Sequence, residues 1–132
     1  FFQAQAAMNR DMKILVVDDL EAMRLSMCDI LSHLGFTNVI AAQDGQRALE
    51  LVRQDRVDFL ITDLDMPGMD GIELLRAIRS DDALKHIPVL FLTAEAEKNS
   101  VVEAAQAGVN DYLLKPFSLD VLDRKIQKIF EQ

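Results

Sequence analysis

The sequence predicts an α/β fold in which a parallel, five-stranded sheet carries helices on both faces. Short apolar and β-branched runs alternate five times with segments whose apolar residues recur at helical spacing. Most of these runs are followed, at the start of a loop, by acidic residues, a threonine or a lysine. Successive right-handed β-α-β connections place helices on both faces of such a sheet. The pattern alone leaves the order of the strands open.

Composition limits the class of protein. The chain has 132 residues, 50% of them apolar, so we expect one globular domain with its own core. A formal net charge of −8 argues against nucleic-acid or anionic-membrane binding, because phosphate groups are bound by basic surfaces. No apolar run reaches the roughly 18 to 20 residues of a membrane span. We therefore expect a cytoplasmic protein with no nucleic-acid partner and no membrane insertion.

The N-terminal end and the single cysteine give further information on the domain's extent and on the class of protein. Residues 1–11 lack a strong period and are interpreted as an N-terminal tail or cloning remnant, so the domain is expected to span 12–132. Cys28 lies in an apolar helical pattern and is interpreted as a small buried side chain. One cysteine excludes both a disulfide framework and a cysteine metal site.

The first half of the chain contains three predicted strands, at 13–17, 38–42 and 58–62. The first is a β-branched run typical of a strand buried on both faces. The helix that follows it ends near Gly35, a residue suited to a C-terminal cap, and has its apolar positions at Met23, Met27, Ile30, Leu31 and Leu34. The next helix carries Ala48, Leu49 and Val52, and the third carries Ile72, Leu75 and Ile78 and ends near 80–82.

The second half contains two more strands. Pro88 precedes the strand at 89–92, where a proline removes no interior sheet bond. A helix with Val101, Val102 and Ala105 follows and is capped by Gly108; the fifth strand, 111–114, ends at Lys115-Pro116. The last helix begins at Ser118 as its N-cap, and its expected core-facing residues are Leu119, Leu122, Ile126, Ile129 and Phe130.

Chemistry is expected at one edge of the sheet. If the strands are parallel, their C-terminal ends bring together Asp18, Asp19, Asp63, Thr93 and Lys115. Three neighbouring carboxylates repel one another unless a cation relieves them, and hard oxygen ligands with room for water suit Mg²⁺. The ion, an ammonium group and a hydroxyl could together neutralise a phosphoryl group moving in line onto a carboxylate. Asp63 would then be a nucleophile that forms an acyl phosphate, which water cleaves again.

Each of these residues has a simpler interpretation when taken alone. Asp18 and Asp19 could cap the first helix, Thr93 could be the N-cap of the fourth, and Lys115 could be a solvated loop charge. Their joint placement at successive strand ends favours the phosphoryl site.

Four motifs resemble one known family. They are Val-Val-Asp-Asp at 16–19, Asp-Leu-Asp-Met-Pro-Gly-Met-Asp-Gly at 63–71, Leu-Thr-Ala at 92–94 and Lys-Pro-Phe at 115–117. Over about 12–131 the sequence resembles receiver domains of bacterial two-component response regulators, and 105–108 and 111–117 bring it closest to the chemotaxis branch. The resemblance implies a doubly wound, flavodoxin-like (βα)5 fold with strand order 2-1-3-4-5.

The resemblance also implies roles for the site residues. Asp63 would accept a phosphoryl group from a histidine kinase, and Asp19, Asp63 and the main-chain carbonyl of Asp65 would bind Mg²⁺. Asp18 would assist through water or directly. Lys115 would pair with Asp63, its position set by a cis peptide bond to Pro116.

A conformational switch and an output surface are implied as well. Thr93 would move to the new phosphoryl oxygen, Tyr112 would turn inward, and one conformer would be favoured over another. The alternative for Tyr112 is an ordinary half-buried aromatic on an edge strand. The expected output face consists of Lys98, Val101, Tyr112, Leu114, Lys125 and Lys128; its alternative is an ordinary solvated surface. The implied partners are the kinase, the flagellar motor switch or another output protein, and a phosphatase.

Three positions depart from the chemotaxis pattern. Leu64 stands where an aromatic residue is expected after the phospho-acceptor, and Glu97 stands where a basic residue is expected beside Lys98. Asp65 replaces an amide and adds negative charge where water must approach the acyl phosphate, so we expect altered Mg²⁺ affinity and hydrolysis.

Two other functions compete with a stand-alone signalling switch, which would catalyse only its own phosphorylation and dephosphorylation. Asp63-Leu64-Asp65 is similar to the Asp-x-Asp motif of haloacid-dehalogenase-type phosphatases, but those enzymes place the motif after their first strand. The second alternative is a receiver module of another pathway, or one excised from a larger regulator.

Overall fold

The fold alternates strands and helices along the whole described chain. The computed structural model describes residues 9–94 and 98–131, with residues 98–100 described by their backbone alone. The strands are β1 (Ile14–Val17), β2 (Val39–Ala42), β3 (Phe59–Asp63), β4 (Val89–Thr93) and β5 (Asp111–Leu114). The helices are α2 (Glu21–His33), α3 (Gly45–Gln54), α4 (Gly71–Ser80), α5 (Lys98–Ala107) and α6 (Leu119–Ile129). Each predicted strand is present, with ends that agree within one residue.

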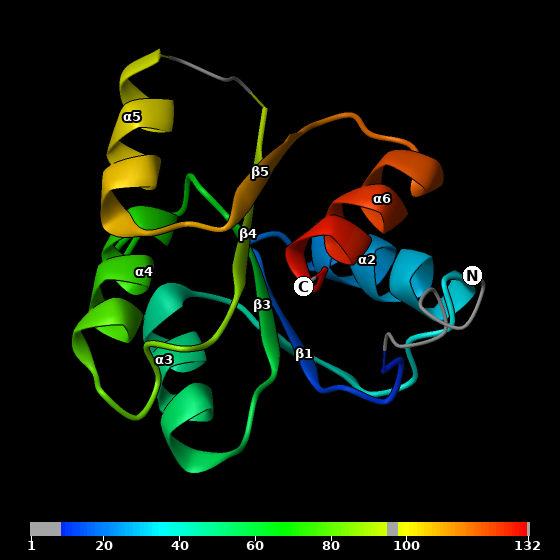
Figure 1. The fold of residues 1–132 in the computed structure, drawn as a ribbon, viewed down its shortest axis with the longest axis horizontal. Helices are drawn as coiled ribbons and strands as arrows, with labels where there is room; N and C mark the ends of the chain where they lie inside the picture. Colours follow the sequence, from blue (N-terminus) through cyan, green and yellow to red (C-terminus); the bar gives the residue numbers. More distant parts are fainter. Residues whose placement is uncertain (1–8, 95–97, 132) are drawn as a thin grey trace.

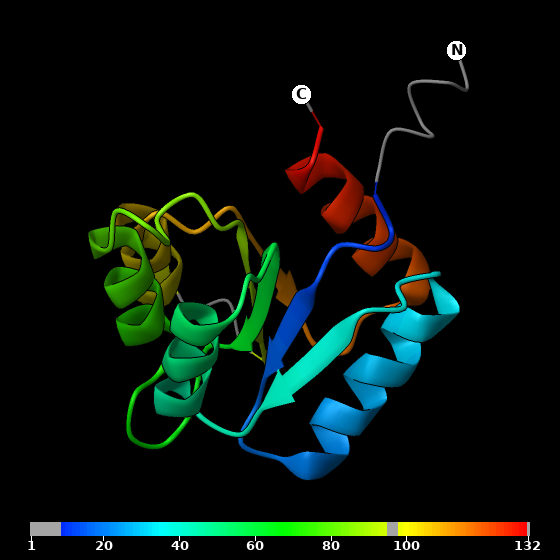
Figure 2. The ribbon, with the colours of Figure 1, turned by 90° about the horizontal axis from the view of Figure 1, so that it is seen from below.

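The five strands form one parallel sheet in the order β2-β1-β3-β4-β5, as the family resemblance implied. Helices α2 and α6 cover one face and α3, α4 and α5 cover the other (Figures 1 and 2). Every residue of β1 is buried, because this strand lies inside the sheet with helices on both sides. The fold is therefore the predicted doubly wound, flavodoxin-like α/β fold.

Each face of the sheet has its own hydrophobic core. Phe59 and Ile61 of β3 point toward α2 and α6, where they meet Leu31 and Ile126. Alternate residues of the same strand, such as Leu60, join Leu75 of α4 on the opposite face. Because successive side chains of a strand point to opposite faces, a strand buried on both sides contributes residues to both cores.

One predicted core-facing residue needs correction. Leu119 does not face the core, since 43% of it is exposed, whereas Leu122 and Ile126 are buried. Leu119 is the first residue of α6, and this first turn lies away from the sheet (Figure 1). Among the side chains of α5 that the structure describes, Ala104 is buried, while Val102 and Ala105 are exposed.

A single arginine ties several elements together at the N-terminal edge of the sheet. The Arg79 guanidinium donates hydrogen bonds to the carbonyl oxygens of Gly108, Lys85 and Ile87 at 3.0, 3.1 and 2.6 Å. It also donates to Asn110 Oδ1 at 3.0 Å. These bonds join the end of α4 to the segments that precede β4 and β5.

The predicted N-terminal tail, 1–11, falls largely outside the described residues. Arg10, which is described, packs on the domain: its Nη1 donates to the carbonyl of Leu34 at 2.9 Å, and its guanidinium lies 4.8 Å from the centre of the Phe36 ring. In the described part of the chain, no helix combines the length and the hydropathy needed to cross a membrane.

Candidate functional site

The register of the sheet brings the predicted site residues to one edge. Val17 is paired with Thr62, so the next residues, Asp18 and Asp63, lie level with each other. On the other side of β3, Asp63 is paired with Leu92, the residue before Thr93. Thr93 is paired with Leu114, the residue before Lys115. Parallel pairing alone therefore places these four side chains at the C-terminal ends of neighbouring strands.

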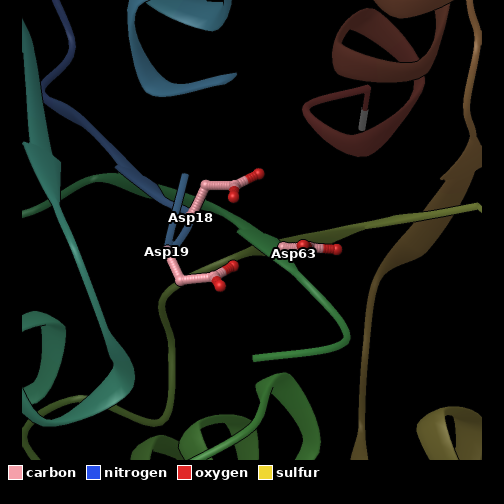
Figure 3. Close-up of side chains that lie close together, drawn as sticks. All are labelled: Asp18, Asp19 and Asp63. Atoms are coloured by element: carbon pink, nitrogen blue, oxygen red, sulfur yellow. The ribbon is translucent and has the colours of Figure 1, made fainter. Parts of the chain in front are cut away.

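Three carboxylates converge at this edge. Asp18, Asp19 and Asp63 each offer an oxygen atom, and these atoms all lie within 4.8 Å of one another. Asp18 and Asp19 extend from the end of β1 and Asp63 from the end of β3 (Figure 3). Asp18 is buried, Asp63 is half-buried and Asp19 is exposed, which leaves a path for water. An oxygen-only donor set that is open on one side fits Mg²⁺, which keeps several of its waters when bound to protein.

Lys115 supplies a positive charge to the cluster. Its Nζ lies 3.5 Å from Asp63 Oδ1 and 3.7 Å from Asp18 Oδ2, and the peptide bond from Lys115 to Pro116 is cis. Only 20% of the lysine side chain is exposed. The alternative of a solvated loop charge is therefore wrong.

Burial has the largest effect on the electrostatics of Asp63. Burial raises the pKa of this carboxyl above its usual value, and the neighbouring charge of Asp18 raises it further. The Lys115 ammonium and the backbone amide of Asp65 act in the opposite direction but do not offset the increase. A group with this environment is stabilised by a bound cation, in agreement with the donor set.

The main chain around Asp18 is held at three points. Its amide donates to Ala42 O at 3.2 Å, its Oδ1 accepts a hydrogen bond from Leu20 N at 3.0 Å, and its carbonyl oxygen accepts one from Arg24 Nη1 at 2.8 Å. The N-cap of α2 is Leu20, with no side-chain cap. The alternative that Asp18 and Asp19 are merely the cap of this helix is therefore wrong.

The loop after Asp63 is packed closely against the start of α4. Asp70 and Glu73 form a capping box, in which each side chain accepts a hydrogen bond from the other residue's backbone. A Cβ on Gly71 would lie 2.7 Å from the carbonyl oxygen of Asp63 and 3.0 Å from the Cα of Leu64. The sequence pattern indicates only that Gly71 interrupts regular structure; its packing role depends on a contact that no local pattern reveals. Leu64, the departure beside the acceptor, is buried in the core.

The two predicted switch residues lie on neighbouring strands. Thr93 ends β4 and is 5% exposed, and Tyr112 is the second residue of β5 and packs partly against the core. Lys125 Nζ lies 5.6 Å from the centre of the Tyr112 ring and 3.0 Å from Asp111 Oδ1. Sequence reasoning did not foresee this ion pair beside the tyrosine, because it joins β5 to α6.

The other expected output residues come from α5, β5 and α6. Leu114 and Lys128 are exposed, and Val101 and Lys125 are half-buried. The side chain of Lys98 and the departure at Glu97 lie outside the described residues. Cys28 is partly rather than fully buried, and this burial raises the pKa of its thiol.

Comparison with known families identifies the class of domain. A family model described as the response regulator receiver domain matches residues 14–127. The chain belongs to this family. Receiver domains are signalling domains rather than metabolic enzymes.

Curated relatives and solved structures agree with this assignment. The receiver domain is 55% identical over 121 residues to the chemotaxis protein CheY of Pseudomonas aeruginosa, covering 92% of this chain and 98% of the relative. It is 50% identical over 128 residues to CheY-3 of Vibrio cholerae, covering 97% and 98%. The structure of V. cholerae CheY4 matches with a TM-score of 0.85 and 32% identity, covering 91% and 99% of the two chains. A putative response regulator from Chloroflexus aurantiacus matches with a TM-score of 0.83 and 32% identity, covering 92% and 99%. The domain is therefore CheY-like.

Proposed function

We propose that this receiver domain is a chemotaxis switch operated by reversible phosphorylation of Asp63. The observation that supports it most is the convergence of Asp18, Asp19 and Asp63 on one another, with Lys115 beside them, at the C-terminal edge of the sheet. The 50–55% identity to chemotaxis proteins supports the pathway. The phosphoryl donor is a CheA-like histidine kinase.

The carboxylates have two proposed roles, Mg²⁺ binding and phosphoryl transfer. Asp19, Asp63 and the main-chain carbonyl of Asp65 would hold Mg²⁺, with Asp18 assisting directly or through water. Bound Mg²⁺ would supply positive charge that offsets the negative charge of the phosphoryl group and of the attacking carboxylate. An Asp63 carboxylate oxygen forms the new bond to phosphorus while the bond from phosphorus to the histidine nitrogen of the kinase breaks. Lys115 pairs with the phosphoryl group, and attack by water later releases inorganic phosphate and restores Asp63.

The signal leaves through the face formed by α5, β5 and α6. Thr93 would move to hydrogen-bond a phosphoryl oxygen, and Tyr112 would turn into the space that Thr93 leaves. Phosphorylation would thereby favour one of two conformers. The output surface comprises Lys98, Val101, Tyr112, Leu114, Lys125 and Lys128. A flagellar motor switch protein is the partner we propose, and a phosphatase would shorten the signal. With such partners, the proposed location of the domain is the cytoplasm.

Intact mass measured after incubation with acetyl phosphate and Mg²⁺ tests the proposal. The wild type is expected to gain one phosphoryl group only when Mg²⁺ is present, and to lose it on standing. Asp63→Asn is expected to gain none. Asp82→Asn is the matched control, because Asp82 is an aspartate 95% exposed beyond the end of α4, and it should behave as the wild type.

Two results would contradict the proposal. The first is phosphorylation of Asp63→Asn to the extent seen in the wild type. The second is a wild type that gains no phosphoryl group either from acetyl phosphate or from a phosphorylated CheA-like kinase. Steady turnover of a generic phosphate ester, lost in Asp63→Asn, would instead support the phosphatase alternative.

A further inference from the structure

Arg24 lies beside the acidic cluster but makes no ion pair there. It is the fourth residue of α2, and its Nη1 donates a hydrogen bond of 2.8 Å to the main-chain carbonyl of Asp18. The bond is partly buried. Arg24 therefore contacts the peptide group that joins Asp18 to Asp19, the two adjacent acids of the cluster.

The turn that presents these two acids has few other restraints. At the start of α2, the N-cap Leu20 offers no side-chain acceptor. By comparison, Asp44, Asp70 and Ser118 each accept a hydrogen bond from the third residue of the helix that they precede. The β1–α2 turn is instead fastened by Asp18 itself, through its amide, its Oδ1 and the carbonyl bonded to Arg24.

That last bond lies directly next to Asp19 in the chain. Asp19 is exposed, and the peptide group bonded to Arg24 immediately precedes its Cα. Rotation of this peptide group would turn the Asp19 carboxylate relative to Asp18 and Asp63. Arg24 limits the rotation by holding the carbonyl oxygen in one direction.

We propose that Arg24 is a positioning residue of the magnesium site, which orients the Asp18–Asp19 peptide so that the three carboxylates converge before the ion binds. This inference rests on the function proposed for Asp63. Preorganised ligands do not have to be ordered at the moment of binding, so the affinity for Mg²⁺ is higher. Asp18, Asp19 and Asp63 contact the ion or the phosphoryl group, whereas Arg24 acts through the turn.

Because Arg24 is charged, the direction of the change in Mg²⁺ affinity on its substitution tests the proposal. A guanidinium near the site repels Mg²⁺, so removing the charge without any change in geometry would tighten Mg²⁺ binding. Loss of the orienting hydrogen bond would weaken it. The two roles therefore predict opposite changes in the dissociation constant.

Titration calorimetry with MgCl₂ distinguishes these roles in the wild type, Arg24→Met, Arg24→Lys and Arg47→Met. Arg47 is the matched control, because it also lies in the first turn of a helix, α3, where its side chain pairs only at the surface, with Glu50 at 3.1 Å. We expect Arg24→Met to raise the dissociation constant about three- to tenfold, because a charge-assisted hydrogen bond is lost. Arg24→Lys, with a different donor geometry, should raise it about twofold, and Arg47→Met should leave it unchanged.

The outcomes separate this inference from the proposed function. Tighter Mg²⁺ binding by Arg24→Met, with a difference that fades as KCl is added, would assign Arg24 an effect of charge alone and overturn the inference. An unchanged dissociation constant with a lowered melting temperature would assign it a role in stability only and would also overturn it. If Arg24→Met does not fold, Arg24→Lys decides, and a constant equal to that of the wild type overturns the inference. A wild type that binds no Mg²⁺ would overturn the proposed function as well.

Discussion

At the scale of single residues, Asp63 is the most informative group. Its carboxylate is half-buried between the negative charge of Asp18 and the positive charge of Lys115, and its pKa is raised chiefly by burial. Asp65 adds a further acid two residues later, with its side chain exposed and its backbone amide acting on Asp63. The chemical properties of the acceptor therefore depend on its neighbours in space and in sequence.

Asp65 gives a prediction at this scale. Asp65→Asn is expected to weaken Mg²⁺ binding about two- to fivefold, because one screened surface charge near the site is worth up to about 1 kcal/mol. At saturating Mg²⁺ the phosphorylated variant should lose its phosphoryl group faster, because less negative charge surrounds the attack by water. Calorimetry and loss of the phosphoryl mass with time measure the two effects. Asp82→Asn controls for the change in net charge, and equal constants for Asp65→Asn and the wild type would show that the Asp65 carboxylate plays no part.

At the scale of elements, the contact between β3 and α4 positions the acceptor. Gly71 begins α4 with its Cα facing the backbone of Asp63 and Leu64, and the Asp70–Glu73 capping box keeps the helix start in place. The Asp63 loop and the helix therefore lie closer together than any residue with a Cβ would allow. Arg79 performs a related task at the opposite end of α4, where it joins the segments that lead into β4 and β5.

Substitution of Gly71 tests this contact. Alanine at a helical position normally stabilises a protein relative to glycine. In Gly71→Ala, however, the new Cβ would meet backbone atoms, so we expect a loss of about 1–3 kcal/mol in the free energy of unfolding and slower phosphorylation by acetyl phosphate.

Gly68→Ala is the control for the same loop. Gly68 has a φ of 76°, and a Cβ at this position would meet no atom within 4 Å, so its substitution introduces backbone strain without a clash. We expect Gly68→Ala to cost about 1–2 kcal/mol of stability and to leave the phosphorylation rate close to that of the wild type. Equal phosphorylation rates for Gly71→Ala and the wild type would contradict the positioning role of the contact.

At the scale of the whole molecule, the carboxylates that would bind the metal lower the stability of the metal-free domain. The metal-free domain gathers three carboxylates, of which Asp18 and Asp63 lie beside the Lys115 ammonium group, and this arrangement costs folding free energy. A ligand that binds only the folded state offsets this cost by mass action, by about 2.7 kcal/mol at one hundred times its dissociation constant. The free energy of unfolding should therefore increase as Mg²⁺ occupies the site.

Urea unfolding with and without Mg²⁺ checks this expectation. Without metal, Asp63→Asn should be about 0.5–2 kcal/mol more stable than the wild type, because a half-buried carboxylate beside another carboxylate is replaced by a neutral amide. Addition of Mg²⁺ should stabilise the wild type and Asp82→Asn strongly and Asp63→Asn much less. Circular dichroism is a suitable probe because the chain contains no tryptophan. A metal-free Asp63→Asn less stable than the wild type would show that the carboxylate contributes favourably to the fold.

Much of this protein was predictable from short stretches of sequence. Strands, helices and the acids at strand ends follow from patterns a few residues long, and alternating strands and helices require a parallel sheet whose C-terminal edge carries Asp63. The motifs supplied the strand order through resemblance to a family. Local periodicity was wrong for Leu119, because it indicates the apolar side of a helix but not how far the sheet beneath it extends.

The tertiary structure alone decided how the site is held together. The approach of Lys115 to both Asp18 and Asp63, the bond from Arg24 to the Asp18 carbonyl and the close packing of Gly71 depend on how separate elements meet. No period or cap signal within one element encodes such contacts. The sequence by itself determined which residues reach the edge of the sheet, because periodicity and strand direction are local properties. Packing determined their distances and charges, because these arise only when chain segments far apart in sequence come together.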